Sequence, residues 1–252
     1  MVVMEGPEPV SLRVKQFFRF TKEETKHLFI SILAVALIFA FDDKRETFNL
    51  AFWLSNFVLI TIIVTFTFLV HVSAQKVAAL KVGYIVEYRM WTMGLVIGLV
   101  VMLLSGGKWY VLLPGGIFIQ HMAIQRLGKF RYGLNIASQG AIAAAGPVAN
   151  LVVATFCLAL TKQFHIIPAL DPLFTLVTTI NFWFLIFMLL PLPNLPGLYL
   201  FFASRLAYVF IFCTLLSYIL LTKIEVYSWI LSVLVGAAAW FLFYIFFEQK
   251  AA

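Results

Sequence analysis

The sequence predicts an all-α polytopic membrane protein with about six to seven transmembrane helices and one re-entrant extended hairpin. Of its 252 residues, 63% are hydrophobic and 12% are charged, and the mean hydropathy is +1.01. A soluble domain of this length has too small a core to bury that much apolar surface. Long apolar segments recur between charged, proline and glycine residues, and one segment rich in glycine lacks a helical pattern.

Seven apolar segments are candidate helices. They lie near residues 28–41, 49–71, 91–104, 136–160, 173–192, 206–221 and 229–247. A full crossing of the hydrocarbon layer takes about 20 helical residues. The second, fourth, fifth and seventh segments are long enough, whereas the first and third need local thinning of the bilayer or their flanking residues.

The basic residues predict the orientation of the chain in the membrane. Residues 1–26 are polar and mostly basic, and the chain carries 18 Lys and Arg against 11 Asp and Glu, a net charge of +7. With alternate loops placed inside, most of the basic residues fall on the side of the N-terminus, which favours a cytoplasmic N-terminus. We therefore expect a multi-pass protein of the cell membrane. Its basic residues predict contact with anionic headgroups on the cytoplasmic side, and no nucleic acid partner.

The segment that does not resemble a helix is 105–120, SGGKWYVLLPGGIFIQ. It has two glycine pairs and a proline around the short β-prone runs WYVLL and IFI. We expect a re-entrant extended hairpin that lies against the helices, since backbone at membrane depth needs protein or water to satisfy it. The alternative is an interfacial loop anchored by Trp109 and Tyr110.

The stretch HVSAQ, residues 71–75, places polar groups after the second apolar segment. His71 and Gln75 have the i, i+4 spacing of the two histidines in H-E-x-x-H, a zinc-binding helix whose glutamate is a general base. Val72 stands where that glutamate would be. Taken alone, the stretch predicts polar groups at the end of a helix near the headgroups.

Four separated stretches, in order, resemble the archaeal branch of the site-2 protease family of intramembrane zinc metalloproteases. They are FTKEETKHLFISILAVALIFAF (20–41), HVSAQKVAALKVGYIVEYRMWTMGL (71–95), AAAGPVANLVVA (143–154) and FMLLPLPNLPG (187–197). The resemblance implies a site-2-protease-like transmembrane core at 27–205, a zinc site within the membrane and a hairpin whose edge strand meets the substrate. A cytoplasmic basic segment, 1–26, precedes this core, and a C-terminal helical pair, 206–252, follows it.

The resemblance assigns the site positions residue by residue, and most of them differ from the family's residues. His71 matches the first zinc-binding histidine, Gln75 stands at the second histidine, and Pro196 stands at the aspartate that supplies the third ligand. Val72 occupies the position of the general base. Met188 occupies that of the asparagine which assists at the substrate carbonyl.

Other matching positions have no part in the hydrolysis. Pro114, Gly115 and Gly116 lie where the family's hairpin meets its substrate, and with Asn194 they are the expected partner-binding residues. The expected structural residues are Gly146, Pro147, Asn150 and Pro191. Pro147 is expected to kink its helix, and Gly146 to allow another helix to approach closely.

One imidazole with carboxamides is a poor set of donors for catalytic zinc, which takes three protein ligands and an open position. We therefore expect no cofactor, no catalytic residue, and an inactive homologue that binds a membrane protein or transmembrane segment in a regulatory, chaperone-like or scaffold role. One alternative is a zinc protease with rearranged ligands, using His71, His121 and a third group. Another is a subunit of a larger membrane complex.

Overall fold

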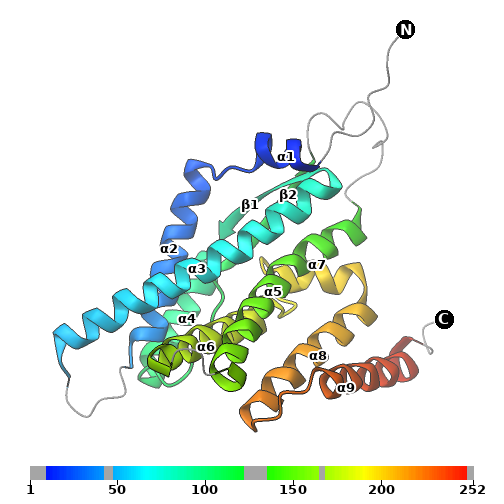
Figure 1. Cartoon of the computed structure of the whole chain (residues 1–252). Helices are drawn as coiled ribbons and strands as arrows, with labels where there is room; N and C mark the ends of the chain where they lie inside the picture. The colour runs from blue at the N-terminus through cyan, green and yellow to red at the C-terminus, as the bar shows by residue number, and fades with distance from the viewer. Residues whose placement is uncertain (1–9, 43–47, 122–134, 165–167, 249–252) are drawn as a thin grey trace.

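The computed structural model describes residues 10–42, 48–121, 135–164 and 168–248, which form a set of packed helices beside one two-stranded sheet (Figure 1). The α-helices and strands are α1 (Val10–Phe17), α2 (Lys22–Ala40), α3 (Leu50–Val82), β1 (Tyr84–Met90), α4 (Thr92–Ser105), β2 (Gly115–His121), α5 (Ile136–Ala159), α6 (Asp171–Met188), α7 (Pro196–Ala203), α8 (Arg205–Lys223) and α9 (Trp229–Phe243). Short π-helical turns extend α5 over Leu160–Phe164 and α9 over Tyr244–Glu248, and a 3₁₀ turn, Pro168–Leu170, precedes α6.

The predicted fold class, an all-α polytopic membrane protein, is confirmed. Within the described residues, five helices are long and apolar enough to cross a bilayer: α3, α5, α6, α8 and α9. Of these, α5, α6 and α9 are counted together with the short turns that adjoin them. The helix α4 is apolar but has 14 residues, and α2 begins with the charged KEETK. The total of six to seven spans therefore stays a prediction.

The helices α2, α3, α5, α8 and α9 begin at polar residues that satisfy free N–H groups of the first turn, whereas α4, α6 and α7 have no side-chain cap. The side chains of Thr21, Asn49, Asn135, Ser204 and Ser228 each accept a hydrogen bond from a backbone N–H two or three residues further on. Such caps stabilise a helix start by about 1 kcal/mol. The helix boundaries therefore follow local sequence signals.

The sheet differs from the predicted hairpin. We expected both extended arms within 105–120, but WYVLL forms no strand, and β2 pairs with β1 from the other side of α4. The two strands are antiparallel from the pair Tyr84–His121 to the pair Met90–Gly115. The residues of β1 alternate between buried and partly exposed, the period-2 pattern of a half-buried strand. The re-entrant position of this sheet in a membrane stays a prediction.

The extended segment before β2 lies along α4. Gly94 and Gly98 are one turn apart on α4, and a Cβ at either position would collide with a backbone carbonyl, that of Leu113 or Val111 respectively. This close approach of backbone to helix, which two glycines permit, explains why the apolar run packs on α4 and does not pair as a strand.

The second correction concerns HVSAQ, which does not end its helix. The helix α3 continues to Val82 and ends at Gly83 in the left-handed conformation (φ 83°), as many helices do. At 33 residues, α3 is about 50 Å long, well beyond the roughly 30 Å hydrocarbon layer. His71 and Gln75 are therefore interior residues of a helix, and both side chains are buried.

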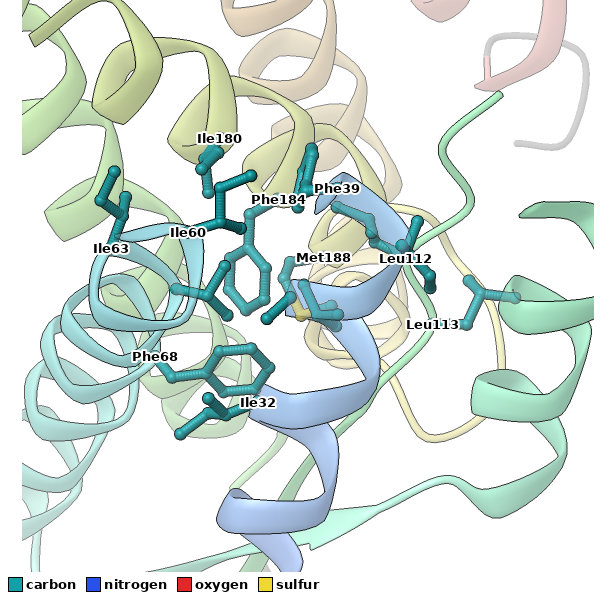
Figure 2. Packing of buried hydrophobic residues seen from close by; sticks show 14 of the residues in the cluster. Ile32, Phe39, Ile60, Ile63, Phe68, Leu112, Leu113, Ile180, Phe184 and Met188 are labelled. Atoms are coloured by element: carbon teal, nitrogen blue, oxygen red, sulfur yellow. The ribbon is translucent and has the colours of Figure 1, made fainter. Parts of the chain in front are cut away.

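The main hydrophobic core lies between α2, α3 and α6. Figure 2 shows Phe68 of α3 beside Phe184 and Met188 of α6, with Ile32 of α2 close by. The rings of Phe68 and Phe184 meet edge to face, with centroids 4.8 Å apart. A second cluster joins α5, α6, α7 and α8. These two cores hold the residues around His71 in place.

Candidate functional site

His71 lies in a buried polar cluster between α3, α5 and α6. Its side chain is 3% exposed, and its ring contacts that of Phe184 edge to face, with centroids 5.2 Å apart. Nδ1 lies 3.4 Å from the amide nitrogen of Asn150, so in this arrangement Nδ1 accepts and Nε2 carries the proton. Nε2 has no hydrogen-bond partner among the described residues. The backbone of α5 covers it, since a Cβ on Gly146 would lie 2.5 Å from Nε2.

Gln75 bonds to a carbonyl that Pro147 leaves without a helical donor. In an α-helix the carbonyl of residue 143 accepts from the N–H of residue 147, but a proline has no N–H. The side chain of Gln75, 1% exposed, donates from Nε2 to the carbonyl oxygen of Ala143 at 3.2 Å. Gln75 therefore joins α3 to α5 at the point where Pro147 interrupts the backbone hydrogen bonds of α5.

Two buried asparagines bond across helices, as polar side chains in membrane helices are expected to do. Asn150 of α5 approaches His71, while Asn181 of α6 donates to Thr67 Oγ1 of α3 at 3.2 Å and to the carbonyl of Val177 at 2.8 Å. Thr67 and His71 are one turn apart on α3. The polar cluster therefore extends along α3 and contacts both neighbouring helices.

The two positions assigned to catalysis are apolar and lie in the main core. Val72 and Met188 are each 1% exposed and belong to the same buried cluster. Neither a valine nor a methionine side chain can take up a proton as a general base does. The structure therefore places hydrophobic packing at both positions.

The donors around His71 do not fit a catalytic zinc ion. Its polar neighbours are carboxamides, which carry no charge, and that of Gln75 is already bonded through its nitrogen to Ala143. In the described part of the chain, no three His, Cys, Asp or Glu residues come together as a metal site would require. The side chain of His121 lies outside the described residues. Pro196, at the third ligand position, is the first residue of α7, where a proline suits the helix because no N–H is needed.

A buried ion pair that the sequence analysis missed lies next to this cluster. Lys76 Nζ is 2.8 Å from Glu24 Oε2, and the side chains are 5% and 1% exposed. The ammonium also donates to the carbonyls of Arg19 (3.0 Å) and Val86 (3.1 Å), so each of its three hydrogens has an acceptor. Glu24 Oε1 accepts from the backbone N–H of Tyr88 at 2.9 Å. The pair thereby connects α2, α3 and β1.

The sequence carried a partial signal for this pair. Glu24 and Lys76 each stand where an apolar helix meets its charged flank. With HVSAQ at the end of a helix, Lys76 would lie in the cytoplasmic loop that follows it. The continuation of α3 to Val82 is what carries its side chain into the protein.

Hydrogen bonds also hold the Pro-Gly-Gly turn that begins β2. The carbonyl oxygen of Pro114 accepts from the hydroxyl of Tyr88 and from the N–H of Trp91, both at 2.9 Å. Ser31 Oγ of α2 lies 2.8 Å from the Tyr88 hydroxyl. Gly115 has φ 129° and passes so close to the carbonyl of Arg89 that a side chain would collide with it.

Two of the four predicted partner-binding residues, Gly116 and Asn194, line a groove beside β2, whereas Pro114 and Gly115 are buried outside its lining. A Cβ on Gly116 would collide with the carbonyl oxygen of Asn194, and Pro196 lies next to the same position. Asn194 itself is exposed and left-handed (φ 62°), in the turn after α6 that also contains the exposed Pro191. The groove has a volume of about 740 Å³. Its walls come from both strands, the start of α5, the turn before α7 and α7 itself: Arg89, Met90, Gly116, Ile117, Phe118, Ile136, Gln139, Pro193, Asn194, Leu198, Tyr199 and Phe202.

The edge of β2 that faces away from β1 borders this groove. Tyr88 directs its N–H to Glu24, away from β2, so Tyr88 and Ile117 form a non-hydrogen-bonded pair. The N–H and carbonyl of Ile117 therefore point to the outer edge, where the carbonyl accepts from the hydroxyl of Tyr199 at 3.3 Å. Sequence patterns did not indicate Tyr199, since nothing in the chain order relates α7 to β2.

The class of protein that this fold defines is a multi-pass helical membrane protein. Over 180 residues the chain is 28% identical to a protein of Methanocaldococcus jannaschii named "Putative zinc metalloprotease MJ0611". The aligned part makes up 71% of this chain and 84% of that protein. No family model matches the chain, and no solved structure is a significant match. The name of a zinc metalloprotease belongs to that relative, and the similarity to it covers most of both chains.

Proposed function

We propose that this chain is a catalytically inactive member of the site-2 protease family. In this proposal it binds a transmembrane segment of a partner membrane protein in the groove beside β2, in a regulatory, chaperone-like or scaffold role. The observation that carries the proposal is the surroundings of His71. The one histidine at the expected metal position has carboxamide neighbours, and the base position is a buried valine.

The donor chemistry argues against hydrolysis by the family's mechanism. Zinc in hydrolases is held by three protein ligands, usually imidazole, carboxylate or thiolate, because these bind the ion more strongly than water does. Gln75 donates its amide N–H to Ala143 and serves the helix interface. The valine side chain at position 72 cannot take the proton from water, and general bases typically contribute about 10²–10⁴ in rate.

The groove beside β2 supports the binding role. A strand edge can pair with an extended peptide through backbone hydrogen bonds, here in place of the bond from Tyr199 to Ile117, and nearby pockets receive the peptide's side chains. Phe118 and Phe202 line the groove and are 42% and 69% exposed. Arg89 and Asn194 add polar groups at the same place. An apolar segment that unwinds locally would find both kinds of contact there.

The proposal places the sheet on the cytoplasmic side of the membrane. Basic residues gather at that end of the molecule: Arg13 Nη1 donates to the carbonyl of Leu80 at 3.3 Å, and Lys76 to that of Arg19. Such residues favour the cytoplasmic side and its anionic headgroups. Cysteine labelling of a tag at the N-terminus in intact cells and in inverted vesicles tests this orientation.

The first test of inactivity is the metal content of the purified full-length protein, measured by mass spectrometry for the wild type and for His71→Ala. We expect no stoichiometric zinc in either. A triple variant that restores the family's residues, Val72→Glu with Gln75→His and Pro196→Asp, is expected to bind zinc and to lose it when His71→Ala is added. Stoichiometric zinc in the wild type that disappears in His71→Ala would overturn the proposal.

That outcome would support the second candidate function, a zinc protease with rearranged ligands. Two observations favour it: Nε2 of His71 has no partner among the described residues, and the relative carries the name of a zinc metalloprotease. Chelator-sensitive cleavage of a helical membrane substrate, abolished by His71→Ala, would establish it.

The binding role is tested by site-specific photocrosslinking in the native membrane. A photoreactive residue replaces Phe202 in the groove, and a matched one replaces Phe246, which is 58% exposed on the turn after α9. We expect a discrete membrane-protein adduct from position 202 that is absent at 246. Tyr199→Phe removes the hydroxyl that is bonded to β2, and it should change the yield of the adduct from position 202. Equal labelling at the two positions would contradict groove binding.

A further inference from the structure

A second groove lies at the helix ends remote from the sheet, between α5, α6 and α8. Its volume is about 370 Å³. The π turn that extends α5 over Leu160–Phe164 lies there, α8 ends there at Lys223, and α6 begins beside them (Figure 1). We propose that this groove binds one anionic phospholipid, with the phosphate diester at the lysines and one hydrocarbon chain along α6.

The groove is polar at the helix ends and apolar toward the middle of the membrane. Lys162, Lys223 and Tyr227 line its outer end. Further in, Phe182 and Ile186 of α6 face Ile219 of α8. A phospholipid has the same order of groups, since its charged phosphate lies at the interface and its chain in the hydrocarbon layer.

The length of the groove suits one leaflet. Along α6 its lining residues run from Thr175 to Ile186. At 1.5 Å per helical residue this distance is about 16 Å, close to half of the roughly 30 Å hydrocarbon thickness. One acyl or isoprenoid chain extended beside α6 would therefore fill the groove from headgroup to midplane.

The charges at the outer end favour an anion. Two lysines and Glu225 give a local charge of +1, and Lys162 Nζ lies 3.4 Å from Glu225 Oε1. The side chains of this pair are 46% and 76% exposed, and exposed ion pairs contribute little stability. A phosphate can therefore replace the Glu225 carboxylate at Lys162 at little cost.

A neighbouring groove provides a contrast. It shares Thr175 and Thr179 with the lipid groove and opens at the same end of the molecule, but Asp42 and Asp171 line it. Carboxylates repel a phosphate diester. The two grooves therefore differ in the charged side chains that line them.

The test is native mass spectrometry of the full-length protein with an equimolar mixture of phosphatidylglycerol and phosphatidylcholine that have identical chains. We expect the wild type to retain one phosphatidylglycerol in preference to phosphatidylcholine. Lys162→Ala and Lys223→Ala should each reduce that preference about fivefold, the contribution of one basic residue at a membrane surface. Glu225→Gln should increase it. The control is Lys108→Ala. Lys108 is an exposed lysine next to Gly107, which adjoins Asp42, and its replacement should leave the preference for phosphatidylglycerol unchanged.

Two further arms separate a lipid from other occupants. Leu220→Trp fills the apolar part from an exposed position (58%), so it should lower retention of both lipids and leave the unfolding temperature unchanged. Glycerol 3-phosphate, which has the phosphate without a chain, should not bind at the concentration that saturates the lipid site. Equal retention of the two lipids, equal losses at Lys108 and Lys162, or binding of glycerol 3-phosphate would each overturn the proposal.

Discussion

Replacing Gln75 by methionine tests whether its carboxamide stabilises the break in α5. Methionine has a similar length and volume but no N–H, so the variant removes the 3.2 Å bond from Nε2 to the carbonyl of Ala143. That carbonyl has no helical donor, because residue 147 is proline. In Gln75→Met a buried acceptor is therefore left without the donor that serves it.

The expected loss follows from two magnitudes. An unsatisfied buried polar group costs about 1–3 kcal/mol. Hydrogen bonds between membrane helices contribute about 0.6 kcal/mol on average and about 1.7 kcal/mol at most. We expect Gln75→Met to lower the free energy of unfolding by about 1–2 kcal/mol. Pro147→Ala restores an N–H that can donate to Ala143 within the helix, so Gln75→Met should cost about 1 kcal/mol less on that background.

The assay is a double-mutant cycle on the free energy of unfolding, measured by titration with sodium dodecyl sulfate in mixed micelles. The cycle isolates the coupling between positions 75 and 147 from the packing changes that each substitution causes alone. If Gln75→Met costs the same with proline or alanine at position 147, the Ala143 carbonyl is not what Gln75 stabilises, and the argument is refuted.

Two further predictions concern the same helices. Lys76→Met should lower the free energy of unfolding by about 3–5 kcal/mol, because it leaves the buried carboxylate of Glu24 without its cation. The control is Lys81→Met, at an exposed lysine of the same helix. Similar losses of stability in the two variants would contradict a role for the ion pair. Gly146→Ala should cost about 1–3 kcal/mol, since its Cβ would lie 2.5 Å from His71 Nε2. His71→Ala should relieve most of that cost in the same unfolding assay, and a full cost in the double variant would show that another contact is responsible.

The sequence predicted the positions of the helices well. Each of the seven apolar segments overlaps a helix, and polar caps such as Asn49 and Ser204 mark the starts. These features depend on local hydropathy and on side-chain bonds to neighbouring backbone groups, which chain order contains. The end of the second segment was placed too early, because polar side chains after an apolar run usually mark an interface, whereas here α3 continues into the protein.

The strand pairing was not predictable in the same way. The alternation in YIVEYRM was present, but its partner lies beyond α4, and the glycines Gly94 and Gly98 hold the intervening segment on that helix. Which extended segments pair depends on contacts between residues distant in the chain. The groove beside β2 is formed by this strand pairing and by Tyr199 of α7, so the sequence could not predict its shape either.

By itself the sequence determined the membrane class and the seven apolar helices, but not α1 or α7, because composition and apolar segment length are local properties. Only the tertiary structure decided that Gln75 serves the carbonyl freed by Pro147, that Lys76 pairs with Glu24, and that His71 lies under Gly146. These contacts arise where α3 packs against α2 and α5. Burial there makes each unpaired polar group costly, so helix packing selects the partners.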